Sequence, residues 1–448
     1  MQVNVAGAGA GKTTKMAKRI IEFKIPDGKI IFCIAFTNAA KESIKNKIIM
    51  KIGSLPKNIK ISTIHSFLYQ EIIKPYFFFL YRKQFDRLSA IDLPDDIIFR
   101  NFKLKDLENS NILHCTKIPE KAKWVVYKKS SDKKHECDIR RRILNYFSSY
   151  CAAIFVDEAQ DIDKDIKLIL ESIDSCGTLV FLYGDPKQDI KGLGYFKKIM
   201  DKVSDIHYIP ESYRCPQNHL DLSNRLASKE EQQFSVAKNK IGSINIVFES
   251  DIEDKQKFVS EGNFGLKYIS HRTKRYETHK QKNNNLFKTL YFEIINAVKE
   301  KWEGKKSSEN IERLAFYTTE TILKEYNIGN KNTIIKKCIN NGAFNKLDKK
   351  QYARIVSILS SPTITTSNVT VPVVSSIESI KGLEAERCLF ILTPDLAPYL
   401  FHEKIFDNKE SHLTYVALTR SLSDLTLLIT EEVEYKYEKP YILSFFNN

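Results

Sequence analysis

A glycine-rich segment at the start of the chain constrains its fold more than any other feature. The run from Val3 to Thr14 reads VNVAGAGAGKTT: a short apolar strand, Val3–Ala6, then alternating glycines, then polar residues that suit a helix. Glycines let the backbone turn its N–H groups around phosphate oxygens, and the N-terminus of the following helix favours negative charge. Ala6 replaces the first glycine of the usual G-x-x-x-x-G-K-[ST] pattern, a common variation. The segment predicts a phosphate-binding loop.

A loop of this kind specifies its ligand through a few side chains. The Lys12 ammonium group is expected to reach the β- and γ-phosphates of a nucleoside triphosphate, and the Thr13 hydroxyl to ligate Mg²⁺. The residues expected to line the bound nucleotide are Gly7, Ala8, Gly9, Ala10, Gly11, Lys12, Thr13 and Thr14.

Short apolar runs alternate with helical patterns in the first half of the chain. After the first strand come Ile30–Ala35, a short strand at Ile61–Phe67 that ends in Thr63, His65 and Ser66, then Ala152–Val156 and Leu179–Tyr183. Buried strands that alternate with helices indicate a doubly wound parallel sheet, so the predicted fold class is α/β.

Acidic and amide side chains stand where two of these strands end. Asp157 and Glu158 follow Ala152–Val156, and Gln188 follows the next strand along the chain. Ligands bind at the carboxyl edge of a parallel sheet. We therefore expect Asp157 to hold Mg²⁺ with Thr13, and Glu158 to orient and deprotonate an attacking water.

The second half of the chain repeats this logic with arginines. Arg214 follows a strand-like segment, Glu384 precedes the strand Cys388–Leu392, and Arg420 lies on an expected helix. Two arginines remote from the loop fit a second sheet that faces the first, from which they would reach the γ-phosphate.

Net charge narrows the class of partner. The chain has a formal charge of +15 and a pI near 9.1. Such a balance favours a polyanionic partner, because neutralising phosphates releases counterions. The alternative explanation of the positive charge is a genome that encodes lysine wherever the protein surface tolerates it. The densest apolar run, Tyr76–Tyr81, is far shorter than the roughly 18 residues of a membrane span, so no membrane partner is expected.

Eight motifs in order give the chain a family resemblance. AGAGAGKT, AFTNAAKE, STIHSF, VDEAQD, GDPKQ, ESYR, KGLE and YVALTR stand as they do in superfamily 1 helicases of the UvrD/Rep/PcrA type, which the chain resembles. The resemblance implies two RecA-like P-loop NTPase domains that close on ATP and Mg²⁺ and move 3′ to 5′ along single-stranded DNA. It assigns ATP hydrolysis to Lys12, Thr13, Asp157, Glu158, Gln188, Arg214 and Arg420.

The resemblance also implies contacts beyond the phosphates. Glu384 would contact the ribose, and Arg272 would be a further arginine on the nucleotide. The expected DNA contacts are Phe36, Thr37, Asn38, Thr63 and His65.

The chain departs from this family at several positions. Only eleven residues precede Lys12, so either the upstream glutamine that reads adenine is missing or the true start of the protein lies further upstream. After GDPKQ the family has stacking aromatic residues, where this chain has Lys191, Leu193 and Gly194. Base stacking is worth about 1–3 kcal/mol per base, so its loss weakens the grip on bases unless Tyr195 or Phe196 replaces it. Tyr195 is the candidate for base stacking on DNA in this chain.

The resemblance divides the chain into two interrupted domains. A basic stretch from Lys121 to Arg142 lies in the first insertion and is interpreted as a DNA-contacting face, the alternative being a solvated helix face. The expected segments are a first RecA-like domain (1–67 and 147–206) with a helical insertion (68–146), and a second (207–275 and 370–448) with a reduced insertion (276–369).

Two functions fit these observations. The first is an ATP-dependent 3′-to-5′ DNA helicase or translocase acting on single-stranded or tailed duplex DNA, in DNA repair or anti-phage defence. The second is a DNA-stimulated ATPase that senses DNA and regulates a partner nuclease, since the reduced insertions resemble those of Gabija-type defence helicase subunits. An RNA-directed helicase ranks third. The eight scattered cysteines, with no C-x-x-C pair, suit a reducing, cytoplasmic location.

Overall fold

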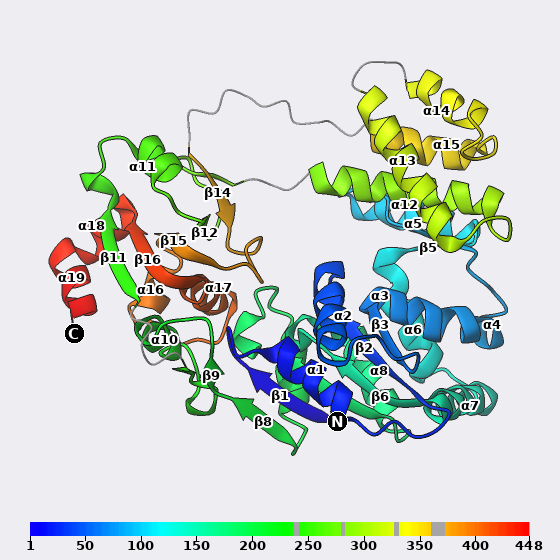
Figure 1. The fold of residues 1–448 in the computed structure, drawn as a ribbon, viewed down its shortest axis with the longest axis horizontal. Coiled ribbons are helices and arrows are strands. Elements are labelled where there is room, and N and C mark those ends of the chain that lie inside the picture. The colour runs from blue at the N-terminus through cyan, green and yellow to red at the C-terminus, as the bar shows by residue number, and fades with distance from the viewer. Residues whose placement is uncertain (237–241, 279–282, 327–330, 360–371, 448) are drawn as a thin grey trace. The chain divides into compact units, whose positions relative to one another are not determined.

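The computed structural model divides the chain into two compact units, and each is described by itself (Figure 1). The core unit comprises Met1–Phe67, Val126–His279 and Asn368–Asn448, and the inserted unit comprises Leu68–Val125 and Lys280–Ser367. The structure describes residues 1–236, 242–278, 283–326, 331–359 and 372–447.

The first sheet of the core unit has six parallel strands in the order β3-β2-β6-β7-β1-β8. Its strands are almost continuous apolar runs, which fits a sheet covered on both faces. On β2, Ile31 and Cys33 face a core shared with helices α1 (Lys12–Glu22) and α2 (Asn38–Ile52), whereas Phe32 faces the aromatic rings of Phe67 and Phe147. The strands are β1 (Gln2–Ala6), β2 (Ile30–Ala35), β3 (Ile59–Thr63), β6 (Cys151–Val156), β7 (Leu179–Gly184) and β8 (Ile206–Ile209).

Helices connect these strands, and their starts are set by side-chain caps. Thr37 accepts a hydrogen bond from the N–H of Ala40 at the start of α2, and Asp163 accepts one from Ile166 at the start of α8. The helices are α1 (Lys12–Glu22), α2 (Asn38–Ile52), α3 (Ile64–Phe67), α7 (Lys134–Tyr150), α8 (Lys164–Asp174) and α9 (Tyr195–Met200), with short turns η3 (Ala159–Asp161) and η4 (Pro186–Gln188).

The second sheet of the core unit is also six-stranded and parallel, in the order β11-β16-β15-β12-β14-β13. Its core contains Phe390 and Leu427 from the sheet and Val416 from helix α17 (Lys409–Leu418). Ala8 and Ile190, from the loops of the first half, belong to the same hydrophobic cluster. The strands are β11 (Ser243–Phe248), β12 (Leu266–Ile269), β13 (Glu277–Thr278), β14 (Val373–Ser376), β15 (Ala385–Leu392) and β16 (Ser421–Ile429).

The remaining elements of the core unit are short. Strands β9 (Glu211–Ser212) and β10 (Phe234–Ser235) form a two-stranded parallel sheet of their own. The helices are α10 (Gln217–Asn224), α11 (Lys255–Glu261), α16 (Ala397–Leu400), α17 (Lys409–Leu418), α18 (Glu431–Tyr437) and α19 (Lys439–Asn447). Two parallel sheets flanked by helices confirm the predicted α/β fold class.

The inserted unit brings two segments far apart in sequence into one core. Leu107 and Ile112 of the first segment pack with Leu290 and Ile294 of the second. A buried carboxylate, Glu293, joins them further by accepting a hydrogen bond from Ser89 at 2.7 Å. The elements are α4 (Lys74–Tyr81), β4 (Arg87–Ser89), α5 (Ile97–Asn109), β5 (Ile112–His114), α6 (Ile118–Val126), α12 (Asn283–Trp302), α13 (Ser308–Tyr326), α14 (Lys331–Asn340) and α15 (Lys349–Leu359).

One predicted segment boundary, at residue 146, falls inside helix α7. The structure places this whole helix in the core unit. The predicted boundary after residue 369 lies outside the described residues. No helix in the described ranges is both long enough and apolar enough to cross a membrane.

Candidate functional site

The glycine-rich loop joins β1 to α1, as the sequence predicts. Gly9 and Gly11 have φ angles of 70° and 69°, a left-handed conformation that side chains disfavour. Helix α1 begins at Lys12, directly after the loop. The first N–H groups of a helix have no hydrogen-bond partner within the helix. The N–H groups of Lys12 and Thr13 can therefore bind an anion.

The loop side chains meet the carboxylates at the end of β6. The Thr13 hydroxyl donates to Asp157 Oδ2 at 3.0 Å, and Lys12 Nζ lies 3.3 Å from Glu158 Oε2. Glu158 has a φ of 55°, an unusual conformation for a residue with a side chain, and also accepts a hydrogen bond from Gln160. The structure thus brings together four of the residues predicted for hydrolysis.

Burial and charge shift the pKa values of this cluster in opposite directions. Burial and the neighbouring Glu158 raise the pKa of Asp157. Burial would also raise the pKa of Glu158, but the ammonium groups of Lys12 and Lys381 outweigh it and lower that pKa. Glu158 is therefore ionised at neutral pH, as a proton acceptor must be.

The same cluster fits a magnesium ion. Mg²⁺ prefers oxygen ligands and is bound in nucleotide sites by one or two protein groups together with phosphates. The Thr13 hydroxyl and the Asp157 carboxylate are two such oxygens within hydrogen-bond distance of each other. No group of three or more histidine, cysteine or acidic side chains suited to a metal occurs in the described part of the chain.

Gln188 lies beside the site in turn η4 but is bonded within its own turn. Its side-chain amide donates to Asp185 Oδ2 at 2.8 Å. Lys187 Nζ lies 3.2 Å from both Asp185 and Glu231. A role for Gln188 in hydrolysis stays a prediction.

Arg214 reaches the loop from the segment after β9. A methyl group added to Gly9 would lie 2.3 Å from Arg214 Cβ, so the two residues are in direct contact. The Tyr213 N–H donates to the Gly9 carbonyl at 2.9 Å. Arg214 Nε lies 2.5 Å from Glu384 Oε2, so two residues predicted to bind the nucleotide form an ion pair.

The other two predicted arginines bond to residues outside the loop in the part of the chain that the structure describes. Arg420 is 1% exposed, and its guanidinium donates to the carbonyls of Val416 and Leu383 at 3.0 and 3.3 Å. It lies between α17 and β16 rather than on a helix, so that part of the prediction was wrong. Arg272 pairs with Glu277 at 2.8 Å, and its side chain is otherwise exposed. Roles for both arginines on the nucleotide stay predictions.

The predicted DNA contacts gather at one edge of the first sheet. Strands β2 and β3 run in parallel with Ala35 opposite Thr63. Thr37 and Asn38 follow β2. His65 lies in helix α3, which follows β3, so the prediction of a strand at 61–67 was wrong beyond Thr63. Thr37, Asn38 and His65 are exposed, and Phe36 and Thr63 are half-buried.

The residues after GDPKQ divide clearly between surface and core. Tyr195, the predicted replacement stacker, is half-buried, and Lys198 Nζ lies 4.6 Å from its ring centre. Phe196 is buried against Gly184, where an added methyl group would lie 2.8 Å from its ring. Phe196 therefore cannot serve as a base stacker without leaving the core.

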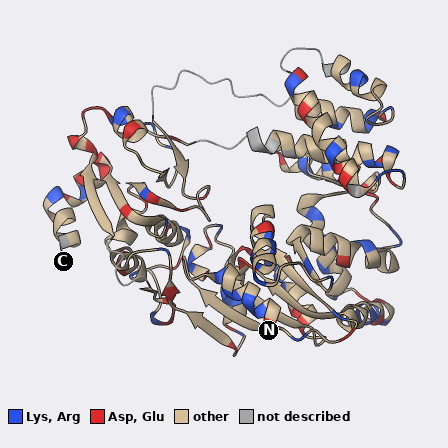
Figure 2. Ribbon diagram, viewed as in Figure 1, with Lys and Arg blue, Asp and Glu red and all other residues tan. Residues whose placement is uncertain are grey.

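The basic stretch interpreted as a DNA-contacting face is partly structural. Arg140 is buried, and its Nε donates to Asp132 at 2.8 Å. Lys121 pairs with Glu108 at 2.7 Å, and Lys123 is buried. Figure 2 shows Lys and Arg distributed over both units among Asp and Glu. The buried members contradict a single exposed basic face.

Two neighbouring arginines test this distinction. Arg140→Ala is expected to lower the free energy of unfolding by about 3–5 kcal/mol, because it leaves the Asp132 carboxylate without its ion-pair partner. Arg141→Ala removes a side chain that is 71% exposed and is expected to change it by less than about 0.5 kcal/mol. Urea unfolding followed by circular dichroism measures both, and equal effects would contradict the assignment.

The structure adds contacts to the loop that the sequence analysis missed. Ala8 donates its N–H to the Tyr415 hydroxyl at 3.1 Å and accepts from Ser212 Oγ at 3.0 Å and from Gln233 Nε2 at 3.2 Å. Tyr415 and Ser212 stand within recognised motifs, which was a usable signal. Gln233 belongs to none of them.

Two further polar contacts join the halves of the core unit. Lys381 Nζ lies 3.0 Å from both carboxylate oxygens of Asp161. His412 contacts the Asp189 carbonyl at 2.9 Å and Asp407 Oδ1 at 2.6 Å. Both partners of His412 accept hydrogen bonds only, so both ring nitrogens donate and the ring is charged. These bonds outweigh burial and raise the pKa of His412.

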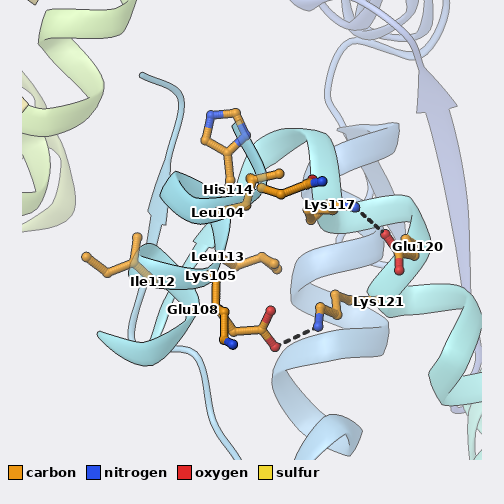
Figure 3. Close-up of a pocket in the computed structure, with 10 residues that line it drawn as sticks. Leu104, Lys105, Glu108, Ile112, Leu113, His114, Lys117, Glu120 and Lys121 are labelled. Carbon is orange, nitrogen blue, oxygen red and sulfur yellow. Dashed lines mark hydrogen bonds and ion pairs between the residues drawn. The ribbon is translucent and has the colours of Figure 1, made fainter. Parts of the chain in front are cut away.

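A separate pocket of about 200 Å³ lies in the inserted unit beside α5 and α6 (Figure 3). Lys117 pairs with Glu120 at 2.8 Å and Lys121 with Glu108 at 2.7 Å, as the dashed lines show. Both ring nitrogens of His114 are also bonded. The charges of this pocket are largely satisfied by one another.

Known proteins can now be compared with this arrangement. Two similar solved structures are an arterivirus nonstructural protein 10, a helicase, in complex with DNA, and the PRRSV helicase. The arterivirus protein is 11% identical to this chain, with a TM-score of 0.37. The match covers 95% of this chain and 60% of the arterivirus chain. The second shows 10% identity and a TM-score of 0.34, covering 96% of this chain and 52% of its own. The chain thus spans little more than half the length of either.

Sequence comparisons bear mainly on the first half. No curated protein sequence matches the chain. A family model described as an AAA domain matches residues 1–193, which include the loop, the Asp157 and Glu158 carboxylates, and Gln188. Over residues 1–193 the chain is therefore similar to the family described as an AAA domain.

Proposed function

We propose that the chain hydrolyses ATP at the glycine-rich loop and uses this reaction to move along or unwind DNA. The contact between the loop side chains and the β6 carboxylates carries the proposal, since Lys12 and Thr13 meet Asp157 and Glu158 within 3.3 Å. The AAA-domain match over residues 1–193 supports nucleotide binding.

The residues would divide the chemistry as follows. Lys12 and the N–H groups at the start of α1 would hold the phosphates. Thr13 and Asp157 would hold Mg²⁺, which neutralises charge on the phosphate oxygens. Glu158, kept ionised by Lys12 and Lys381, would accept the proton of the attacking water. Arg214, in contact with Gly9, would stabilise charge on the transferred phosphoryl group.

The proposed nucleic-acid partner is single-stranded or tailed duplex DNA, along which the chain would move from 3′ to 5′. The net charge of +15 and the exposed side chains at the ends of β2 and β3 support a polyanionic partner at this edge. One of the two similar helicase structures was solved with DNA, which agrees with this partner without identifying it for this chain.

A second candidate function rests on the missing stacking residues. Leu193 and Gly194 stand at stacking positions, and Phe196 is buried. A weak grip on bases favours a DNA-stimulated ATPase that senses DNA and regulates a partner nuclease, as in an anti-phage defence system.

Paired assays on the purified chain test these functions. ATP hydrolysis is expected to rise on adding single-stranded DNA, and DNA binding to weaken steeply as salt is raised, because binding releases counterions. Displacement of a strand from a 3′-tailed duplex, with a 5′-tailed duplex as control, supports the helicase. Stimulated hydrolysis without displacement supports the sensor. Absence of ATP hydrolysis with DNA and with RNA would contradict both.

A further inference from the structure

Three groups around the phosphate-binding loop close a ring of hydrogen bonds. The Ala8 N–H donates to the Tyr415 hydroxyl at 3.1 Å, that hydroxyl donates to Gln233 Oε1 at 3.0 Å, and Gln233 Nε2 donates back to the Ala8 carbonyl at 3.2 Å. Each group acts in its proper role as donor or acceptor, so the ring fixes the orientation of the Gln233 amide. Both backbone groups of one loop residue are thereby bound to side chains from elsewhere in the chain.

Gln233 is itself held firmly. Its N–H donates to Asn224 Oδ1 and its carbonyl accepts from Asn224 Nδ2, both at 2.8 Å, so the end of α10 fixes its backbone. The residue is only 4% exposed. The buried Gln233 amide is bonded at both its oxygen and its nitrogen, and the loss of either bond would remove a partner from a buried polar atom.

The loop is shaped to receive this side chain. A methyl group at Gly7 would lie 2.1 Å from Gln233 Oε1, so a side chain at this position would displace the Gln233 amide from its place in the ring. Gly9 and Gly11 differ, because their φ angles themselves favour glycine. Gly7 is thus in close contact with the Gln233 side chain.

The ring does not use the N–H groups at the start of α1. It takes up the backbone of Ala8, while the N–H groups of Lys12 and Thr13 stand at the start of α1. Tyr415 lies in α17, which packs against the second sheet. The ring thus connects the loop of the first sheet to a helix of the second.

We propose that Gln233 is a positioning residue that, with Tyr415, holds the phosphate-binding loop in its nucleotide-binding shape and ties that shape to the second sheet. This inference rests on the proposed function, because it requires ATP to bind at the loop. Gln233 does not contact the reacting atoms. It acts through Ala8, and loss of the ring lets the loop sample other shapes, so ATP binds less tightly.

The experiment compares Gln233→Leu, Tyr415→Phe and the double variant with the unaltered chain. The dissociation constant for ATP is measured by fluorescence titration without DNA, and KM and kcat with single-stranded DNA. Each single variant is expected to weaken ATP binding and raise KM about 3–10-fold, the range for one or two net hydrogen bonds, with a smaller change in kcat. The double variant is expected to bind ATP as tightly as the single variant with the lower affinity, because either change alone opens the same ring.

Two further variants separate positioning from general damage to the fold. Gln217→Leu removes a glutamine that accepts the Ser235 N–H at 2.8 Å but does not contact the loop, and ATP binding is expected to change less than twofold. Gln233→Glu keeps the size and the acceptor for Tyr415 but loses the donor to Ala8, and it is expected to weaken ATP binding as Gln233→Leu does. Thermal unfolding confirms that each variant tested is folded.

The outcomes distinguish the two levels of the proposal. Unchanged ATP affinity in folded Gln233→Glu or Tyr415→Phe would overturn this inference alone, as would effects of the two single changes that simply multiply. An unaltered chain that fails to bind ATP would overturn the proposed function and this inference with it.

Discussion

Glu158→Gln is expected to lower ATP turnover about 10²–10⁴-fold while ATP still binds, because the amide cannot accept the proton of the attacking water. The carboxylate is placed for this task. It follows β6, adopts a φ of 55°, and lies 3.3 Å from Lys12. Lys12 and Lys381 lower its pKa, so the unaltered residue is ionised over the neutral range and active as a base.

Steady-state ATP hydrolysis and ATP titration measure the two halves of this prediction separately. Lys12→Ala provides a contrast, since it is expected to remove ATP binding as well as turnover. Glu22→Gln is the matched control, because Glu22 lies on the exposed surface of α1 and pairs only loosely with Lys18 at 3.8 Å. Turnover that persists in both Glu158→Gln and Lys12→Ala would refute the assigned site.

Arg214→Ala is expected to lower kcat about 10³–10⁵-fold, the range for arginines that stabilise phosphoryl transfer from outside the loop. The structure favours Arg214 over the other arginines because it contacts Gly9 directly. Its guanidinium forms an ion pair with Glu384 and donates to the Thr419 carbonyl at 3.5 Å. The Arg420 guanidinium instead donates hydrogen bonds to carbonyls in its own half of the core unit.

Single-turnover hydrolysis with saturating ATP isolates this effect from nucleotide binding. Arg313→Ala is the comparison, because Arg313 is an exposed arginine of the inserted unit that pairs with Glu309 at 2.7 Å and has no predicted role at the loop. Its loss is expected to leave kcat within about threefold, as for a surface ion pair worth less than about 1 kcal/mol. A loss in Arg313→Ala equal to that in Arg214→Ala would contradict the role assigned to Arg214.

The sequence predicted the parts of the fold whose signals are local. Strands β1, β2, β6 and β7 begin or end within one or two residues of the predicted runs, because parallel strands buried on both faces read as continuous apolar segments. Asp157 and Glu158 follow directly from the end of such a strand. The sharing of one core by the two insertions could not be predicted in this way, since Leu107 and Leu290 carry no mark of their contact.

Burial accounts for the errors at individual side chains. Arg140 in the basic stretch and Phe196 after GDPKQ are residue types common on nucleic-acid-binding surfaces, yet both are buried. A sequence does not reveal whether a charged side chain has an ion-pair partner in another element, or whether an aromatic ring packs against a glycine there. Asp132 and Gly184 supply those partners here.

The sequence by itself determined the loop, its lysine and threonine, and the carboxylates at the end of β6, because each depends on a few contiguous residues with fixed local geometry. Only the tertiary structure decided what holds that loop in place. Gln233 and Tyr415 lie 225 and 407 positions from Ala8, and no sequence period links them. Their hydrogen bonds exist because packing of the second sheet brings α17 and the end of α10 to the loop, where a buried amide and a buried hydroxyl must find partners.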